Sequence, residues 1–530
     1  MKQYLSHSSA ITLWILIFPL IAFFLLAEEF HESEITARLG WLILLIAFSY
    51  LVRIRFLYFL ILLPFALSGI VDLFYTSTFN QQFEASLVRV LTDTDSQETQ
   101  EFLSVYLGPF NLSILALYFA GLFYLSRELK FFRPQSFKTK LLVVGGVLML
   151  IVAVQQIWFH DRYKDVLPGA FGQITDGLKK YYKVQNEMKK RPELLANYQL
   201  PVLKEEAKPQ TYIVVIGESA ARGHYGLFGY QRNTTPLLES IKKDLILFDD
   251  VVSPYAVTYL SLSHTLTEKN LDNKSEFADS LSLVGLSKKA GFKTWWISNQ
   301  PKYEGTTLSL SLIADHAEYV SESGGYDEAV LPAVENALKD QSSHKVIFIH
   351  LRGSHMTYSK RYPKEYELFD NELGVDIYTK EPTEKQVDIV NAYDNSVVYT
   401  DKILYELIES LKLEKSISGL VYFSDHGEEV YNYKDFIGHE LKRVTPAMFE
   451  IPFFVWVNDL YKSSFKEKLN AMKSQRSMSF LNDDFFDFGL CFMGINGDVA
   501  KQASSPCESK FSPKKRVVAG KLYQDGELYD

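Results

Sequence analysis

Five apolar runs in the first third of the chain constrain its fold more than any other feature. They are Ile11–Ala27, Leu39–Val52, Phe56–Tyr75, Val105–Leu125 and Leu141–Phe159. A helix needs about 20 apolar residues to cross the hydrocarbon core of a bilayer, so four runs qualify and Leu39–Val52 is marginal. We therefore predict a transmembrane domain of five helices over residues 1–160, in contact with the lipid bilayer.

The connections between these runs differ in charge, which sets their orientation. The second and third runs are separated by Arg53 and Arg55, and the fourth and fifth by Arg127, Lys130, Arg133, Lys138 and Lys140. The other two connections are acidic. Because loops rich in Lys and Arg stay in the cytoplasm, five spans place the carboxyl-terminal part on the far side of the membrane. The runs carry few internal charges, which favours an anchor over a transporter.

The composition of the remainder excludes several classes of protein. The 530 residues include 55 Lys+Arg against 64 Asp+Glu, an acidic balance that argues against nucleic-acid binding. Two cysteines, Cys491 and Cys507, are too few for a disulfide scaffold or a Cys-rich zinc cluster. Whether these two pair is left open by the sequence.

Residues 161–210 read as an amphipathic linker at the membrane surface, and residues 211–530 as an α/β domain. Strands are expected at Tyr212–Gly217, Leu245–Val252, Thr294–Ser298, Val346–Leu351, Leu420–Ser424 and Pro452–Val457, and helices at Thr235–Lys243, Ala278–Ala290, Tyr326–Leu338 and Glu384–Lys412. Gln386 follows Thr383 by three residues, which is a capping-box pattern for the last helix. Alternating strands and helices indicate a mostly parallel sheet covered by helices.

Acidic residues and histidines follow several of these strands. Glu218 ends the first strand, Asp425 and His426 end the fifth, His355 follows the fourth, and His439 lies in a later loop. Carboxylates and imidazoles are zinc ligands, and sites in such sheets form at the carboxyl ends of the strands. The pattern predicts a metal site there. His350 lies inside its strand and is expected to pack in the core.

A metal of this kind activates hydroxyl groups, so a nucleophile is expected nearby. The segment SPYAVTYLSLSHTLT offers the hydroxyls of Thr258, Ser261, Ser263, Thr265 and Thr267. A helix that begins near Thr258 would present free N–H groups to a phosphate. Composition does not choose among the five hydroxyls.

The chain resembles the membrane-anchored phosphoethanolamine transferases of Gram-negative bacteria, in the alkaline phosphatase/sulfatase superfamily. The matching strings are VVIGESAARGHYGLFGYQRNTTP, SPYAVTYLSLS, KTWWISNQ, HLRGSH, VYFSDHGEE and GHE. It looks closest to the branch that modifies periplasmic glucans. The resemblance implies a multi-pass protein of the bacterial inner membrane whose catalytic domain, of the alkaline phosphatase/sulfatase fold, lies in the periplasm.

The resemblance also implies a role for individual residues. Thr258 matches the nucleophile, which with Glu218, Asp425 and His426 binds one tightly held Zn²⁺. His355 and His439 match the histidines that bind the donor phosphate or a second Zn²⁺. Asn299 and Gln300 lie where the family contacts the donor headgroup.

The implied reaction moves phosphoethanolamine from phosphatidylethanolamine to a periplasmic or cell-envelope glycan through a covalent threonine intermediate. Two departures stand out: no cysteine lies near Thr258, which weakens lipid A as the acceptor, and Glu304 stands near a position that is basic in the lipid A-modifying members. Phosphoglycerol transfer from phosphatidylglycerol and a non-catalytic protein with a decayed site are the alternatives. A sulfatase is disfavoured, because Thr258 is followed by YLSLS rather than a C/S-x-P-x-R context.

Overall fold

The structure is a computed structural model. It describes residues 7–27, 32–51, 54–93, 96–127, 137–160, 162, 166–188, 194–196, 198, 203–204, 206–273, 275–301, 306–321, 325–370, 376–377, 381–496 and 504–529. Arg53, Lys130, Arg133 and Glu304, which the sequence interpretation used, lie outside these residues. The chain divides into two compact units, Met1–Gln185 and Asn186–Asp530.

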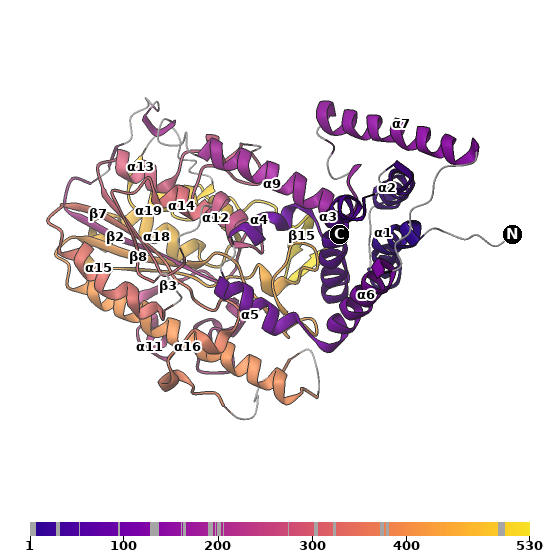
Figure 1. Ribbon diagram of the computed structural model, residues 1–530. Helices are drawn as coiled ribbons and strands as arrows, with labels where there is room; N and C mark the ends of the chain where they lie inside the picture. The colour runs from indigo at the N-terminus through magenta and orange to yellow at the C-terminus, as the bar shows by residue number, and fades with distance from the viewer. Residues whose placement is uncertain are drawn as a thin grey trace. The chain divides into compact units, whose positions relative to one another are not determined.

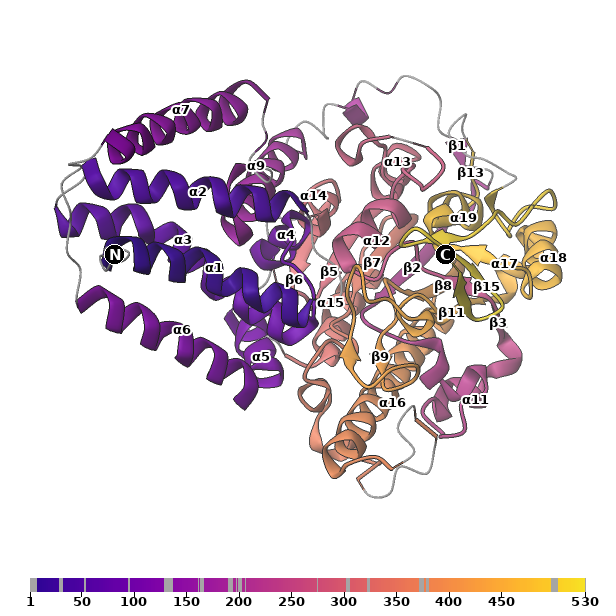
Figure 2. The ribbon, with the colours of Figure 1, turned by 90° about the vertical axis from the view of Figure 1, so that its right-hand side faces the viewer.

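The first unit is helical (Figure 2). Its helices are α1 (His7–Leu26), α2 (Glu32–Leu51), α3 (Arg55–Phe79), α4 (Ala85–Asp93), α5 (Ser96–Tyr106), α6 (Pro109–Arg127), α7 (Phe137–His160) and α9 (Gly169–Met188). Helix α1 packs against α2, α3 and α6, and α2 packs against α7. The first, second, third and fifth apolar runs fall largely on α1, α2, α3 and α7, and most of the fourth run falls on α6.

Three stretches of this unit meet the length and hydropathy of a membrane span. They are Ser9–Leu26, Phe56–Phe79 and Pro109–Arg127, and α7 holds a shorter apolar segment, Val143–Trp158. The fourth predicted run is interrupted between α5 and α6. Helix α6 begins at Pro109, and proline is favoured at the first position of a helix. Three apolar helices are therefore established, and five transmembrane helices stay a prediction.

Three charged side chains, Glu34, Arg38 and Asp72, are buried together in this unit and are called here the ionic cluster. Each is at most 3% exposed. The Arg38 guanidinium donates to the Glu34 carboxylate and to Asp72 Oδ2, the latter at 2.7 Å. The backbone N–H groups of Gly169 and Ala170 donate to Glu34 and Asp72, each at 2.8 Å. The cluster thus satisfies two of the free N–H groups at the start of α9 and ties that helix to α2 and α3.

The second unit is built on one seven-stranded sheet, with the order β3-β11-β8-β2-β7-β5-β6. These strands are β2 (Gln210–Gly217), β3 (Leu245–Leu247), β5 (Lys293–Ser298), β6 (His316–Tyr319), β7 (His344–His350), β8 (Ile417–Ser424) and β11 (Phe453–Val457). The five strands from β8 to β6 are parallel, whereas β11 is antiparallel to both β8 and β3.

The prediction of a mostly parallel sheet is therefore wrong, and the sheet is mixed. The reason lies in residues 425–452, which hold the short strands β9 (Glu429–Val430) and β10 (Ile437–Gly438) and a 3₁₀ turn. A parallel neighbour would need a long crossover, usually a helix, to bring the chain back to the other end of the sheet. Here β11 starts at the end where β8 stops, so it runs antiparallel.

One predicted strand is split in two. Residues Leu245–Val252 form β3 and the separate β4 (Val251–Val252), because β4 pairs with β12 (Phe480–Leu481) instead of the main sheet. Smaller elements of this unit are β1 (Leu203–Lys204), α14 (Thr306–Ser311), α17 (Asp459–Ser464), α18 (Lys466–Gln475), β13 (Ile495–Asn496), β14 (Val517–Val518), β15 (Lys521–Gln524) and β16 (Glu527–Tyr529).

Helices cover both faces of the sheet (Figure 1). One face carries α11 (Pro236–Ser240), α15 (Val330–Lys339) and α16 (Glu384–Lys412), and the other carries α12 (Thr258–Thr265), α13 (Leu283–Lys289) and α19 (Phe485–Phe492). The capping box of α16 is confirmed, because Thr383 Oγ1 accepts from the Gln386 N–H and Gln386 Oε1 accepts from the Thr383 N–H.

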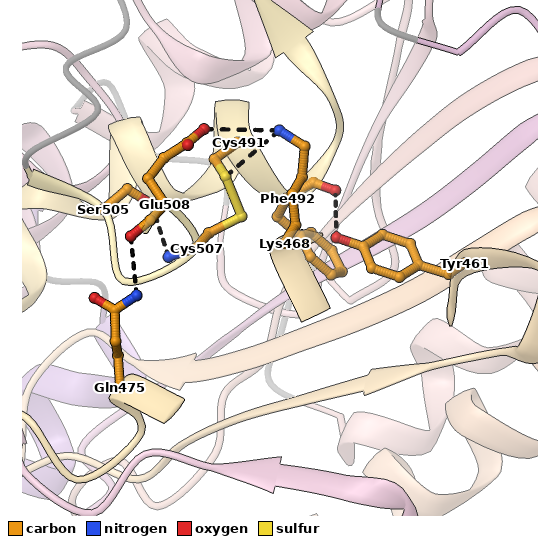
Figure 3. The surroundings of a disulfide bond; sticks show 8 residues. All are labelled: Tyr461, Lys468, Gln475, Cys491, Phe492, Ser505, Cys507 and Glu508. Carbon is orange, nitrogen blue, oxygen red and sulfur yellow. Dashed lines mark hydrogen bonds and ion pairs between the residues drawn. A yellow bond between two sulfur atoms is a disulfide. The ribbon is translucent and has the colours of Figure 1, made fainter. Parts of the chain in front are cut away.

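A disulfide joins Cys491 on α19 to Cys507, 16 residues later (Figure 3). Closing a loop of this length removes conformational entropy from the unfolded chain worth about 3 kcal/mol. We therefore expect reduction to lower the free energy of unfolding of this unit by about that amount, as measured by denaturant titration with and without dithiothreitol. A Cys491→Ala/Cys507→Ala variant should be insensitive to the reductant, and equal stability of oxidised and reduced wild type would contradict the expectation.

Candidate metal centre

The carboxyl ends of β2 and β8 bring three predicted ligands together. The two strands are paired in register up to Gly217 and Ser424, so Glu218 and Asp425 leave the sheet side by side. His426 follows directly. All three side chains are at most 1% exposed, and their ligand atoms lie within 4.8 Å of one another.

Thr258 is the fourth member of this group and comes from a different element. It is the first residue of α12, and its Oγ1 lies 3.3 Å from Glu218 Oε2 and 3.3 Å from His426 Nε2. His426 Nε2 lies 3.4 Å from Glu218 Oε1 and 3.3 Å from Asp425 Oδ2. One imidazole, two carboxylates and one hydroxyl therefore converge on one point.

These spacings suit a tetrahedral zinc ion. Ligand atoms about 2.0–2.1 Å from Zn²⁺ lie roughly 3.3 Å apart along the edges of the tetrahedron. Asp425 Oδ2 is buried and has no hydrogen-bond partner in the part of the chain that the structure describes, as expected for an atom that binds a cation. The residues present thus fit a zinc ion.

Neighbouring groups hold the ligands in place. His426 Nδ1 lies 2.8 Å from the Gly427 carbonyl oxygen, which fixes the proton on Nδ1 and leaves Nε2 to bind a metal. Asp425 Oδ1 accepts from the backbone N–H groups of Ser219 and His426. Burial lowers the pKa of His426, which favours the neutral imidazole that a metal requires.

The structure also separates the five hydroxyls of the 253–267 segment. Ser261 bonds to the Asp425 carbonyl, and Ser263 and Thr267 bond to carbonyls of α12. Thr265 is fully buried. Of the five, Thr258 is the one whose hydroxyl reaches Glu218 and His426.

The predicted histidines stand beside this group. The rings of His439 and His426 have centroids 4.1 Å apart, and His439 Nδ1 lies 2.6 Å from Glu428 Oε2. Burial lowers the pKa of His439, but the Glu428 carboxylate outweighs it and raises the pKa above its usual 6.5. Burial, with Arg361 and Arg352 nearby, holds the pKa of His355 well below 6.5. His426, Glu428 and His439 form a second group that could hold a metal.

The two residues matched to the donor headgroup have protein partners. Gln300 Nε2 donates to Glu218 Oε2 at 3.2 Å and to the Leu351 carbonyl at 3.1 Å. Asn299 Nδ2 donates to Asp327 Oδ1 at 2.8 Å, although Asn299 Oδ1 has no hydrogen-bond partner among the described residues. Contact of either residue with a headgroup stays a prediction.

The hydrogen bond from Gln300 to the candidate ligand Glu218 was not predicted from the sequence, because the two residues are 82 positions apart in the chain. Sequence reasoning also missed Glu428, whose one signal is its place two residues after His426 in the string DHGEE. His350, by contrast, is buried against the edge of Trp296, as expected for a core residue.

Gln300 should therefore strengthen the binding of Zn²⁺ at this site. Its hydrogen bond orients Glu218, and loss of such an outer partner typically costs 10–100-fold in metal affinity. We expect Gln300→Ala to weaken Zn²⁺ binding by about that factor, measured by competition with a chromophoric chelator. Gln341→Ala, a change of the same kind at an exposed position, is the control. Unchanged zinc affinity together with weaker donor binding would instead assign Gln300 to the headgroup.

Comparison with known proteins finds relatives over most of the chain. The family model Sulfatase matches residues 210–495. The chain is 29% identical to phosphoethanolamine transferase EptC of Escherichia coli (strain K12) over 428 residues, which are 75% of this chain and 73% of that protein. It is 29% identical to phosphoethanolamine transferase OpgE of the same strain over 424 residues, 76% of this chain and 74% of that protein.

Two solved structures are also similar. The carboxyl-terminal periplasmic domain of E. coli EptC in complex with Zn matches with a TM-score of 0.56 and 30% identity, over 62% of this chain and 95% of that one. The integral membrane lipooligosaccharide phosphoethanolamine transferase A of Neisseria meningitidis matches with a TM-score of 0.66 and 19% identity, over 94% and 97%. The second likeness concerns the fold, and it includes the amino-terminal helices. This chain belongs to the sulfatase family, among relatives that are named phosphoethanolamine transferases.

Proposed function

We propose that this chain is a zinc-dependent phosphoethanolamine transferase, which moves phosphoethanolamine from phosphatidylethanolamine to a glycan of the cell envelope. The observation that carries the proposal is Thr258 at the start of α12, with its hydroxyl 3.3 Å from both Glu218 and His426. A hydroxyl so placed among zinc ligands is an activated nucleophile. The names of the relatives support the transferred group.

The metal would be held by Glu218, Asp425, His426 and Thr258. A zinc ion bound there supplies positive charge that lowers the pKa of a hydroxyl and stabilises phosphate oxygens. The chain's own residues fix the ligand directions, through Gly427, Ser219 and Gln300, so that no reorganisation is needed when charge develops.

The reaction has two displacement steps. Thr258 Oγ1 attacks the phosphorus of the donor, the bond from phosphorus to the diacylglycerol oxygen breaks, and phosphoethanolamine remains on Thr258. The Thr258 proton leaves toward Glu218 Oε2, and the diacylglycerol oxygen takes a proton from His439, whose raised pKa favours the protonated imidazole. An acceptor hydroxyl then attacks the same phosphorus and gives its proton to the deprotonated histidine. The bond from phosphorus to Thr258 Oγ1 breaks, and Thr258 takes its proton back from Glu218.

The apolar helices account for the location. A donor embedded in the bilayer requires an enzyme held at its surface, and α1, α3 and α6 are long and apolar enough to span a membrane. We propose five transmembrane helices over residues 1–160, a linker at the membrane surface over 161–210, and a periplasmic catalytic domain over 211–530, in a multi-pass protein of the bacterial inner membrane.

The test is lipid turnover by the full chain in detergent with Zn²⁺ bound, given fluorescent phosphatidylethanolamine and phosphatidylglycerol in separate reactions. We expect fluorescent diacylglycerol from the first lipid, and its loss when a chelator removes the metal. Release from phosphatidylglycerol instead would overturn the donor and indicate phosphoglycerol transfer. Release from neither lipid, with Zn²⁺ bound and a glycan acceptor present, would indicate a decayed site.

A further inference from the structure

Glu428 is a buried carboxylate, and each of its two oxygens is hydrogen-bonded to a side chain. One partner is His439, and the other is Tyr358, which lies three residues after His355. Glu428 Oε2 lies 2.6 Å from His439 Nδ1, and Glu428 Oε1 accepts a hydrogen bond from the Tyr358 hydroxyl at 2.7 Å. Glu428 has no exposed surface and Tyr358 is 4% exposed, whereas the His439 side chain is 19% exposed. The carboxylate therefore lies behind the imidazole, on the side away from solvent.

The geometry distinguishes an orienting carboxylate from a metal ligand. Two ligands of one tetrahedral zinc ion lie roughly 3.3 Å apart, whereas 2.6 Å between a nitrogen and a carboxylate oxygen is a short charge-assisted hydrogen bond. A carboxylate oxygen accepts, so His439 Nδ1 carries the proton. The nitrogen that remains available is Nε2.

We propose that Glu428, held by Tyr358, is a positioning residue that fixes the tautomer and direction of His439, so that Nε2 serves the transferred phosphoryl group. The inference rests on the proposed function, because it assigns a supporting partner to a histidine of that site. Glu428 acts through His439 and does not itself bind the metal or the substrate.

Tyr358 extends this arrangement to the segment that carries the other histidine. It lies three residues after His355, behind the left-handed backbone of Thr357 at φ 64°. Its ring meets the edge of Tyr393 at 4.9 Å between centroids, and the Tyr393 hydroxyl donates to the Ser219 carbonyl beside the metal site. Glu428 thus connects the segments of His355 and His439 through its hydrogen bonds to Tyr358 and His439, and Tyr358 packs against Tyr393.

The kinetic test uses the full chain and compares Glu428→Ala, Glu428→Gln and Tyr358→Phe, with diacylglycerol release as the readout. Loss of such a supporting carboxylate typically costs 10–100-fold, so Glu428→Ala should lower kcat by about that factor, with the KM for donor lipid and the zinc content unchanged. Glu428→Gln retains an acceptor for Nδ1 and should recover part of the loss. Tyr358→Phe should cost about 3- to 10-fold, because it removes one hydrogen bond to a charged group.

A double-mutant comparison shows whether Glu428 acts through His439. If it does, Glu428→Ala should cause little further loss in a His439→Ala background. Glu365→Ala, which removes an exposed carboxylate, is the matched control and should leave kcat close to wild type. An equal loss in both backgrounds, or a loss of zinc in Glu428→Ala, would overturn the inference.

A measurement without substrate separates this inference from the proposed function. In ¹⁵N-histidine-labelled protein, the ring signal that disappears in His439→Ala should show the proton on Nδ1 in wild type and a changed tautomer balance in Glu428→Ala. If wild type releases no diacylglycerol from any donor, the proposed function fails and this spectrum still decides the role of Glu428. An unchanged His439 signal in Glu428→Ala would contradict it.

Discussion

Thr258→Ala should abolish release of diacylglycerol while leaving the fold and the bound zinc in place. The hydroxyl supplies the attacking oxygen, and enzymes that lose their nucleophile retain only what binding and charge stabilisation contribute. We expect a loss of about 10³-fold or more in kcat. Because Thr258 is half-buried at the start of α12 and the other three ligands remain, the free energy of unfolding should change little.

Two companion variants make this result specific. Thr258→Ser keeps a hydroxyl at the same place and should retain measurable activity. Ser263→Ala removes a hydroxyl that bonds to Leu260 and His264 within α12 and should behave like wild type. Without acceptor, mass spectrometry of wild type should find phosphoethanolamine on the peptide that contains Thr258. Full activity of Thr258→Ala would exclude Thr258 as the nucleophile.

Asp425→Ala should release the metal and with it the activity. It removes one of two buried carboxylates that face His426 Nε2. Loss of a ligand should weaken Zn²⁺ binding by more than the roughly 10–100-fold that outer partners contribute. The measurement is zinc content after dialysis against a chelator, beside diacylglycerol release by the same samples.

The control for charge is Asp388→Ala, which removes an exposed carboxylate on α16 and should keep the zinc. Added Zn²⁺ should restore part of the activity of Asp425→Asn, which keeps one oxygen ligand, and little of the activity of Asp425→Ala. Wild-type zinc content in Asp425→Ala would remove Asp425 from the ligand set.

The main strands and the candidate ligands at their ends were predictable from local patterns. A strand buried on both faces is a continuous apolar run, and the residue that follows it lies at the edge of the sheet. Glu218 or Asp425 alone is a weak signal, and the metal prediction came from their combination with histidines at the ends of separate strands. The direction of β11 was not predictable in this way, because it depends on how residues 425–452 turn at the end of β8, and no periodicity reports that.

Pairings between distant residues were the other limit. Gln300 and Glu218 meet only because β5 and β7 place the turn after Ser298 beside the end of β2. Choosing Thr258 among five hydroxyls likewise required the first turn of α12 in three dimensions. In the first unit, Asp72 stood out as a single charge near the end of an apolar run, and nothing in its neighbourhood pointed to Arg38 or to the backbone of residue 170.

The ionic cluster affects the folding of the first unit during synthesis and the truncations that this unit can tolerate. Glu34 is synthesised 135 residues before Gly169, and Asp72 is synthesised 98 residues before Ala170. The N–H groups of these later residues complete the hydrogen bonds of the two carboxylates. A nascent chain that ends before α9 lacks these backbone donors, so its Glu34 and Asp72 carboxylates have fewer hydrogen bonds. An incomplete buried network of this kind is costly in free energy. A fragment or chimera that stops at residue 160 would carry that defect permanently. We therefore expect a stable fragment of the first unit to need the residues through the first turn of α9.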